Sequence, residues 1–163
     1  MRNWIILISV VISMAFGSWP GNAATPDAKY LKELQGERFT RLPDGIITDN
    51  KTGLEWKEGP NRPMDWFQTQ AWIKDLGDGW RTPTRYELKG LYISTSPRKG
   101  PDHETSVKLD PAFKLNETYY VWSERGFSSN TAWFVLFQSG NDTCGPADVA
   151  GEGCRAFAVR SRK

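Results

Sequence analysis

The chain has 163 residues, with 21 Lys and Arg against 19 Asp and Glu, and a formal net charge of +2. This balance excludes a dedicated nucleic-acid binder, which would concentrate positive charge on one face. Eight Trp, eight Phe and five Tyr supply large side chains for a hydrophobic core. A chain of this length and composition is expected to form a single domain.

Residues 1–24 have the three-part layout of a secretory signal peptide, with the basic Arg2, an apolar run over residues 4–16, and small residues at Ala23 and Ala24. The apolar run is shorter than the ~20 residues of a membrane-spanning helix. We therefore expect an exported protein, periplasmic or extracellular, that is not an integral membrane protein once processed. Residues 25–38 would then form an N-terminal arm and residues 39–163 the domain.

The domain is predicted to open with a meander of short strands. Pro43-Asp44-Gly45 separates strands over residues 39–42 and 46–48. In such a turn, Pro fixes one backbone angle, Asp accepts a local hydrogen bond and Gly adopts a positive φ. Residues 49–53 form a second turn before a strand over residues 54–56.

Two capped helices are predicted next. Asp65 and Gln68 have the spacing of a capping box for the first helix, which ends at Gly77, and Thr84 and Glu87 have it for the second. The predicted buried faces consist of Trp66, Ala71, Trp72, Ile73 and Leu76 on the first helix and Leu88, Leu91 and Tyr92 on the second.

The rest of the chain is predicted to form a long surface loop and three further strands. Residues 94–111 are rich in Ser, Pro, Lys, Gly and Asp without periodicity, which is typical of a loop. Strands are expected over residues 119–123, 132–138 and 155–160. Separate helical and strand segments of this kind predict an α+β domain.

The chain has two cysteines and one histidine. Cys144 and Cys154 are ten positions apart in the exported part, where a disulfide between them is the simplest expectation. With His103 as the lone histidine and no phosphate loop or dinucleotide fingerprint, the residues do not support triad or nucleotide chemistry. We therefore expect no cofactor and no enzymatic activity.

Five segments in this order resemble a known family: residues 48–56 (TDNKTGLEW), 79–88 (GWRTPTRYEL), 120–123 (YVWS), 132–137 (AWFVLF) and 154–160 (CRAFAVR). The family is named after the C-terminal domain of a collagen-like bacterial adhesin, the Lcl C-terminal domain. The resemblance implies a C-type-lectin-like fold, shared in outline with formylglycine-generating enzymes, in which two helices pack on small, mostly antiparallel sheets. The adhesin that names the family binds sulfated polysaccharides.

The motif residues are interpreted mainly as structural. Arg81 is expected to be buried beside a carboxylate, either Glu87 or Glu55, because a charged side chain between buried elements needs a partner. The same structural role is assigned to the remaining motif residues, which are Asp49, Gly53, Trp56, Trp80, Pro83, Glu87 and Trp122.

These observations leave several functions open, of which non-catalytic recognition at the cell envelope is favoured, with a polysaccharide or an envelope protein as partner. An anionic polysaccharide would be bound by the basic residues Arg98, Lys99, Lys108 and Arg125. A calcium-dependent lectin would use Asn141 and Asp142 as oxygen ligands. A relative of the formylglycine-generating enzymes would need a closely spaced cysteine pair, whereas nine residues separate Cys144 from Cys154.

Overall fold

The computed structural model describes residues 37–93, 98–99, 106–114 and 118–162. The predicted signal peptide, the predicted start of the mature chain and nearly all of the predicted arm lie outside the described residues, as does His103. Within the described ranges, no helix is long and apolar enough to cross a membrane.

The first sheet is built from the predicted meander and the last strand of the chain. Strands β1 (Phe39–Arg41), β2 (Ile47–Asp49) and β3 (Leu54–Glu58) pair in sequence, and β10 (Phe157–Ser161) completes the order β1-β2-β3-β10 with every pairing antiparallel. Gly45 has a φ of 86° in the first predicted turn, a conformation that a glycine adopts without strain. The three predicted strands are therefore confirmed.

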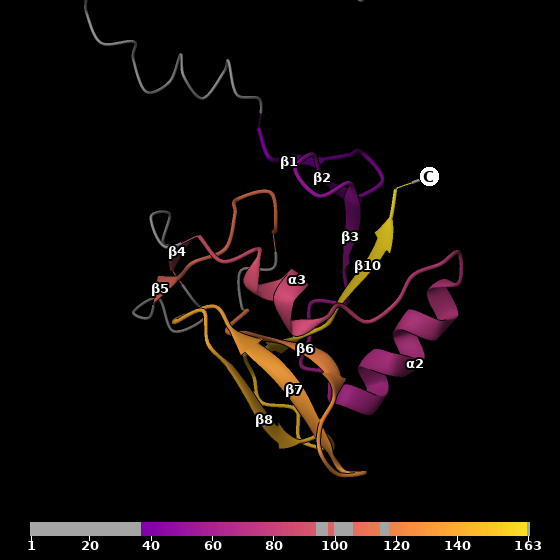
Figure 1. Ribbon diagram of the computed structural model, residues 1–163, viewed down its shortest axis with the longest axis vertical. Helices are drawn as coiled ribbons and strands as arrows, with labels where there is room; N and C mark the ends of the chain where they lie inside the picture. The colour runs from indigo at the N-terminus through magenta and orange to yellow at the C-terminus, as the bar shows by residue number, and fades with distance from the viewer. Residues whose placement is uncertain (1–36, 94–97, 100–105, 115–117, 163) are drawn as a thin grey trace, which may run out of the picture. The chain divides into compact units, whose positions relative to one another are not determined.

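Both helices begin where their caps predict. Helix α2 (Trp66–Leu76) and helix α3 (Arg85–Lys89) each start with a complete capping box, and Gly77 ends α2 with a φ of 57°. The predicted buried face of α2 is too large, because only Thr69 and Ile73 are fully buried on this helix. Helix α2 lies beside the sheets (Figure 1).

The second sheet contains a strand that the sequence pattern did not predict. Its order is β8-β7-β6-β9, formed by β6 (Tyr120–Arg125), β7 (Thr131–Leu136), β8 (Asp142–Pro146) and β9 (Cys154–Arg155). Strand β9 runs parallel to β6, and the other pairings are antiparallel. Strand β8 has the composition of a turn, with Asp, Gly and Pro, and its pairing with β7 overrides that local preference.

The segment predicted as one long loop contains a small hairpin. Strands β4 (Arg98–Lys99) and β5 (Ser106–Val107) pair antiparallel, and Tyr92 forms an isolated bridge with Leu109. Val107 and Leu109 are buried. This part of the loop is therefore anchored to the core.

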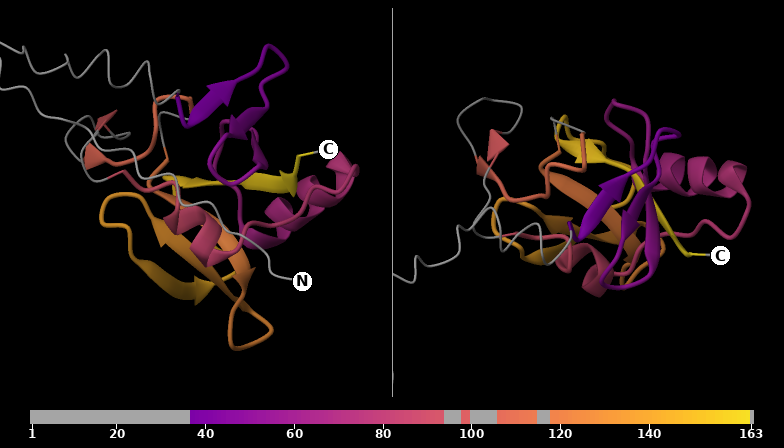
Figure 2. Two further views of the ribbon diagram at one scale, coloured as in Figure 1. Left: turned by 45° about the horizontal axis from the view of Figure 1, so that its top comes forward. Right: turned by 90° about the horizontal axis from the view of Figure 1, so that it is seen from above.

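The predicted last strand is in fact two strands in different sheets. Strand β9 belongs to the second sheet and β10 to the first, with Ala156 between them. Figure 2 shows β10 running between the N-terminal strands and the sheet of β6, β7 and β8. The Gly59 amide donates to the Ala156 carbonyl oxygen over 2.8 Å, and a Cβ on Gly59 would lie 2.9 Å from that oxygen. This close approach requires glycine at position 59.

The main core lies where the two sheets and α3 meet. The Phe113 ring stacks on Phe157 at 5.4 Å and meets the edge of Phe39 at 5.4 Å. The other buried members of this cluster are Ile47, Trp56, Leu88, Leu91, Val107, Leu109, Val121, Val135, Phe137 and Val159. With two helices on small, largely antiparallel sheets, the domain is α+β as predicted.

Asp49, the last residue of β2, links the first sheet to Arg38 before β1 and to the turn that follows β2. Its side chain is only 1% exposed and accepts hydrogen bonds from Arg38 Nε (3.1 Å), Arg38 Nη2 (2.8 Å) and the Lys51 amide (2.9 Å). Burial alone would raise the pKa of this carboxyl, but the hydrogen bonds from Arg38 and its neighbours lower it below 3.8. Arg38 also donates to the Gly90 carbonyl oxygen after α3.

We predict that Asp49→Asn lowers the free energy of unfolding at pH 7 by about 2–3 kcal/mol, because a buried, charge-assisted hydrogen-bond set is lost. A carboxyl with a lowered pKa stabilises the fold above its unfolded pKa, so the difference between wild type and variant should shrink as the pH falls through and below 3.8. Urea denaturation at pH 7 and pH 3 measures both effects. The exposed helix residue Asp75 provides the control, and Asp75→Asn should change stability by less than about 0.5 kcal/mol. Equal effects of the two substitutions would contradict the role of Asp49.

Candidate functional site

A β-bulge in β6 places two consecutive polar side chains opposite one residue of β7. Trp122 pairs with Phe134 and Arg125 pairs with Ala132, so Ser123 and Glu124 together oppose Trp133. Bulges of this kind redirect side chains and are frequent beside functional sites. Here the bulge directs Ser123 and Glu124 toward the N-terminus of α3.

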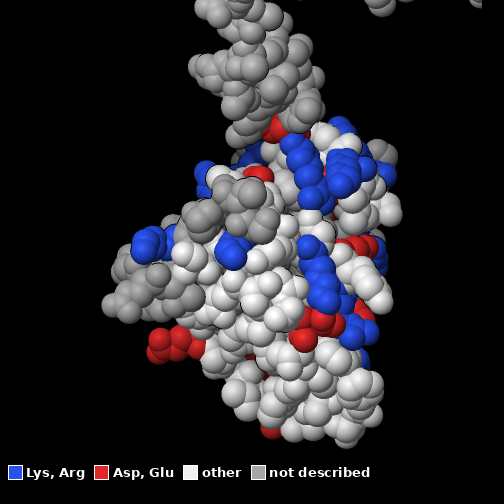
Figure 3. All heavy atoms as spheres, turned by 60° about the vertical axis from the view of Figure 1, so that its left-hand side comes forward, with Lys and Arg blue, Asp and Glu red and all other residues white. Residues whose placement is uncertain are grey.

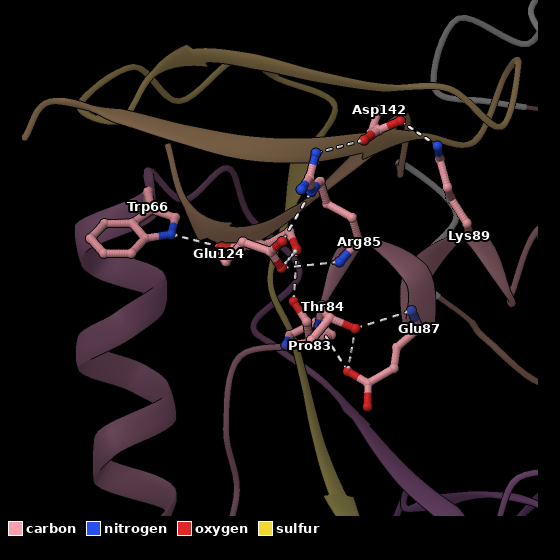
Figure 4. A network of polar contacts seen from close by, with 9 residues as sticks. Trp66, Pro83, Thr84, Arg85, Glu87, Lys89, Glu124 and Asp142 are labelled. Carbon is pink, nitrogen blue, oxygen red and sulfur yellow. Dashed lines mark hydrogen bonds and ion pairs between the residues drawn. The ribbon is translucent and has the colours of Figure 1, made fainter. Parts of the chain in front are cut away.

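Three elements converge at the bulge (Figure 4). The Ser123 hydroxyl oxygen lies 2.8 Å from the Pro83 carbonyl oxygen and 3.0 Å from Glu124 Oε2. The Trp66 indole N–H donates to the Ser123 carbonyl oxygen over 2.8 Å. The start of α2, the start of α3 and the bulge are therefore held together by hydrogen bonds.

Arg85 is the central cation of this site. Its Nε donates to Glu124 Oε1 over 2.9 Å, its backbone N–H donates to Glu124 Oε2 over 3.1 Å, and its Nη1 donates to Asp142 Oδ2 over 3.2 Å. The guanidinium carbon lies 4.1 Å from the centre of the Trp133 ring. These contacts, of which the Glu124 hydrogen bond is the largest, raise the pKa of Arg85. The guanidinium is fixed in one orientation above an aromatic ring.

Asp142 joins β8 to the same group. Its Oδ1 is paired with Lys89 Nζ and its Oδ2 with Arg85. The hydrogen bond from Lys89 is the main reason that the pKa of Asp142 lies below 3.8. Two cations and two carboxylates thus form one network over α3, β6 and β8, which we call the Arg85 network: Arg85, Lys89, Glu124 and Asp142.

The Arg85 network includes Asp142, one of the two oxygen ligands named for the alternative calcium-dependent lectin. Both carboxylate oxygens of Asp142 are already used in ion pairs, and Asn141 is an exposed turn residue. In the part of the chain that the structure describes, no group of three His, Cys, Asp or Glu is placed to hold a metal ion.

An aromatic surface lies beside the network. The Phe127 ring meets the Trp133 ring edge-on at 5.2 Å and 73°, and Phe127 is 87% exposed. Trp133 is half-buried between Phe127 and Arg85, and Cys144 is its direct partner on β8. We call Phe127 and Trp133 the aromatic platform. Sequence reasoning missed this site, because a bulge and a cation–π contact leave no local pattern.

The structure does not gather the four basic residues predicted to bind an anionic polysaccharide. Lys108 contacts the Tyr92 ring at 5.7 Å, and its backbone N–H donates to Phe137, just beyond the end of β7. Arg125 contacts the Trp66 ring at 5.4 Å and pairs with Ala132 near the start of β7. Ala132 and Phe137 are five positions apart, which corresponds to about 17 Å at roughly 3.3 Å per residue.

The two remaining basic residues lie in the small hairpin. Arg98 and Lys99 form β4, and Lys99 is exposed. Lys99 pairs with Ser106, two residues before Lys108. The β4–β5 hairpin and Arg125 are therefore separate regions of the domain, and together they do not form the predicted face.

Arg81 has its predicted partner but not its predicted burial. Its guanidinium donates to Glu87 Oε2 over 2.9 Å and to Oε1 over 2.6 Å. The side chain is nevertheless 46% exposed, because Arg81 borders the open side of β10 through its bridge to Val159. An exposed pair of this kind contributes about 0.2–1 kcal/mol rather than the 3–5 kcal/mol of a buried pair.

The other motif residues have structural surroundings. Trp80 is covered by Arg160, whose guanidinium carbon lies 4.4 Å from the indole ring. The Trp122 N–H donates to the Met64 carbonyl oxygen over 2.8 Å. Glu87 accepts from the Thr84 amide over 2.8 Å in the α3 capping box. Trp56, Pro83 and Asp49 are buried, and Gly53 has a φ of 70°.

The disulfide predicted between Cys144 and Cys154 is not confirmed. Both residues are free thiols. Cys144 lies in β8 and Cys154 in β9, with β7 and β6 between them. Three strand spacings amount to about 14 Å, whereas a disulfide requires Cα atoms within about 7 Å. Sequence separation suggested a short loop, but the sheet places the two residues on opposite edges.

Residues 45–160 match the Lcl C-terminal domain family. The chain belongs to this family. Four of the five segments that carry the resemblance form strands or their connecting turns, and residues 79–88 lead into α3. A comparison with curated proteins finds no match.

We predict that the two thiols differ strongly in reactivity. Burial raises the pKa of Cys154 to about 12, so this residue should resist iodoacetamide at pH 8, whereas the half-buried Cys144 should be alkylated. Peptide mass spectrometry after labelling distinguishes the two sites. In unfolded, unreduced protein both cysteines should react, and the absence of any free thiol there would show that they are bonded after all.

Proposed function

We propose that this protein is an exported, non-catalytic recognition domain with a C-type-lectin-like fold that binds carbohydrate at the bacterial cell envelope. The fold part is supported by family membership and by the arrangement of two helices on two small sheets. The export part rests on the sequence of residues 1–24. The binding part rests on the site formed by the Arg85 network and the aromatic platform.

The observation that carries the proposal is the fixed guanidinium of Arg85 above Trp133. Glu124 and Asp142 hold this guanidinium from two sides, and Phe127 extends the aromatic surface into solvent. Sugar rings present C–H faces that pack on aromatic rings and hydroxyl groups that bond to charged or polar side chains. A site that already has its bound geometry loses little conformational entropy when a ligand arrives.

The proposal that the domain is not an enzyme is supported by the burial and the raised pKa of Cys154 and by the separation of the two cysteines. A nucleophilic cysteine needs a lowered pKa and access to solvent. Cys154 is fully buried and its pKa is raised to about 12, mainly by burial. A relative of the formylglycine-generating enzymes would also need two close cysteines, and two strands separate these.

The export part predicts the mass of the mature protein. If residues 1–24 are a cleaved signal peptide, protein recovered from outside the cytoplasm should begin near Thr25. Intact-mass spectrometry of natively expressed protein measures this directly. Recovery of a chain that retains residues 1–24 in the membrane fraction would refute cleavage.

If the domain binds carbohydrate at this site, it should bind at least one member of an array of neutral and sulfated glycans. Trp133→Ala should weaken that binding at least tenfold, because it removes the aromatic ring under Arg85. Phe67→Ala is the control, because Phe67 is an exposed aromatic residue on α2 that packs on Trp66 instead. Circular dichroism and urea denaturation check that both variants are folded. Chelator should leave binding unchanged, because ion pairs occupy Asp142.

Two results would overturn parts of this proposal. Binding that disappears with chelator and with Asp142→Ala would favour the calcium-dependent lectin. Failure of the wild-type protein to bind any glycan would refute carbohydrate recognition and leave an envelope protein as the partner to seek.

A further inference from the structure

The charges of the Arg85 network cancel within the site. Arg85 is paired with Glu124 and Asp142, and Lys89 is paired with Asp142. An incoming sulfate or carboxylate would have to compete with Glu124 and Asp142 for cations that they already hold. Burying such an anion without a new partner would cost free energy.

Arg125, the basic residue that follows Glu124 in β6, points away from the platform. Because of the bulge, Arg125 lies on the opposite side of β6 from Glu124, where its guanidinium contacts Trp66 at 5.4 Å. The bulge therefore brings an acidic residue to the aromatic platform and removes a basic one from it.

Apart from the Arg85 network, the turn beside the platform is uncharged, since residues 126–131 are Gly, Phe, Ser, Ser, Asn and Thr. Figure 3 shows that the lowest part of this face, at the height of the β6–β7 turn and β8 in Figure 1, is almost free of charged side chains. Hydroxyl and amide groups are exposed in the β6–β7 turn, from Ser128, Ser129 and Asn130. These groups donate and accept hydrogen bonds without carrying charge.

The turn that carries Phe127 is held firmly. Thr131 closes it, with its Oγ1 accepting from the Ser128 amide over 3.0 Å and its carbonyl oxygen accepting from the Gly126 amide over 2.8 Å. A Cβ on Gly126 would lie 2.5 Å from Thr131 Oγ1 and 2.6 Å from Cys144 Sγ. The backbone thus packs closely against β7 and β8 at the base of the exposed Phe127 ring.

We propose that the ligand of this site is an uncharged saccharide that packs a ring face against Phe127 and Trp133 and bonds to the hydroxyl and amide groups around them. This inference rests on the proposed function and narrows its ligand class. A neutral polyhydroxylated ring matches both features of the surface, an apolar platform and uncharged hydrogen-bonding groups. A polyanion matches neither.

The test is a titration of the full chain with neutral probes (cellohexaose, chitohexaose and mannan) and with dextran sulfate, at 50 and 500 mM NaCl. We expect a neutral probe to bind best, with an affinity that changes less than about twofold between the two salt concentrations, since no counterions are exchanged. Phe127→Ala should weaken that binding roughly tenfold, and Phe127→Tyr, which keeps the ring, should recover most of the loss. Phe67→Ala should bind as the wild type does.

Each other outcome is decisive. Preferred binding of dextran sulfate that falls tenfold or more with salt would overturn the inference while leaving carbohydrate recognition intact. If a neutral probe binds equally well to wild type and to Phe127→Ala, the inference would also be overturned, because the saccharide would then bind elsewhere on the domain. No binding to any probe or array glycan would overturn the proposed function as well. Binding to neutral phosphatidylcholine vesicles that is lost in Phe127→Ala, without glycan binding, would identify the ring as a membrane contact and refute both.

Discussion

The whole domain depends on one buried stretch of chain that belongs to two sheets at once. Cys154 to Val159 are all fully buried, and within them the chain leaves β6 and joins β3. The change of sheet takes one residue, Ala156, and requires a backbone without a side chain at Gly59. Phe157 then stacks on Phe113 in the core between the sheets. The crossing links β6, the strand that carries the bulge, to the first sheet.

The candidate site shows how a local defect in a regular sheet produces a surface with its own chemistry. In an unbulged β6, Ser123 and Glu124 would point to opposite faces. The extra residue puts both on the side of α3, where Glu124 meets Arg85 one position after the helix cap. The cap fixes where α3 starts, the bulge supplies the carboxylate, and Asp142 of β8 supplies the second. A rigid arginine over Trp133 results from three features, none of which is unusual alone.

The sequence predicted those features that depend on neighbours in the chain. The turn at Pro43-Asp44-Gly45 and the capping boxes at Asp65 and Thr84 need only a few adjacent residues, and all three are confirmed. Strand β8, the bulge and the split between β9 and β10 arise from pairings with distant strands. The exposure of Arg81 and the separation of the cysteines likewise depend on which strands become neighbours. A pattern of residue types along the chain does not contain that information.

The crossing at Ala156 also has a consequence for the order of events during synthesis. A nascent chain that ends before residue 154 lacks β10, one of the two partners of β3, and β9, one of the two partners of β6. Neither four-stranded sheet can therefore be completed on the ribosome until this segment has emerged. Domains that close through early, local contacts can fold while translation continues. This one must wait for residues 154–161, so we expect its two sheets to be completed only late in synthesis.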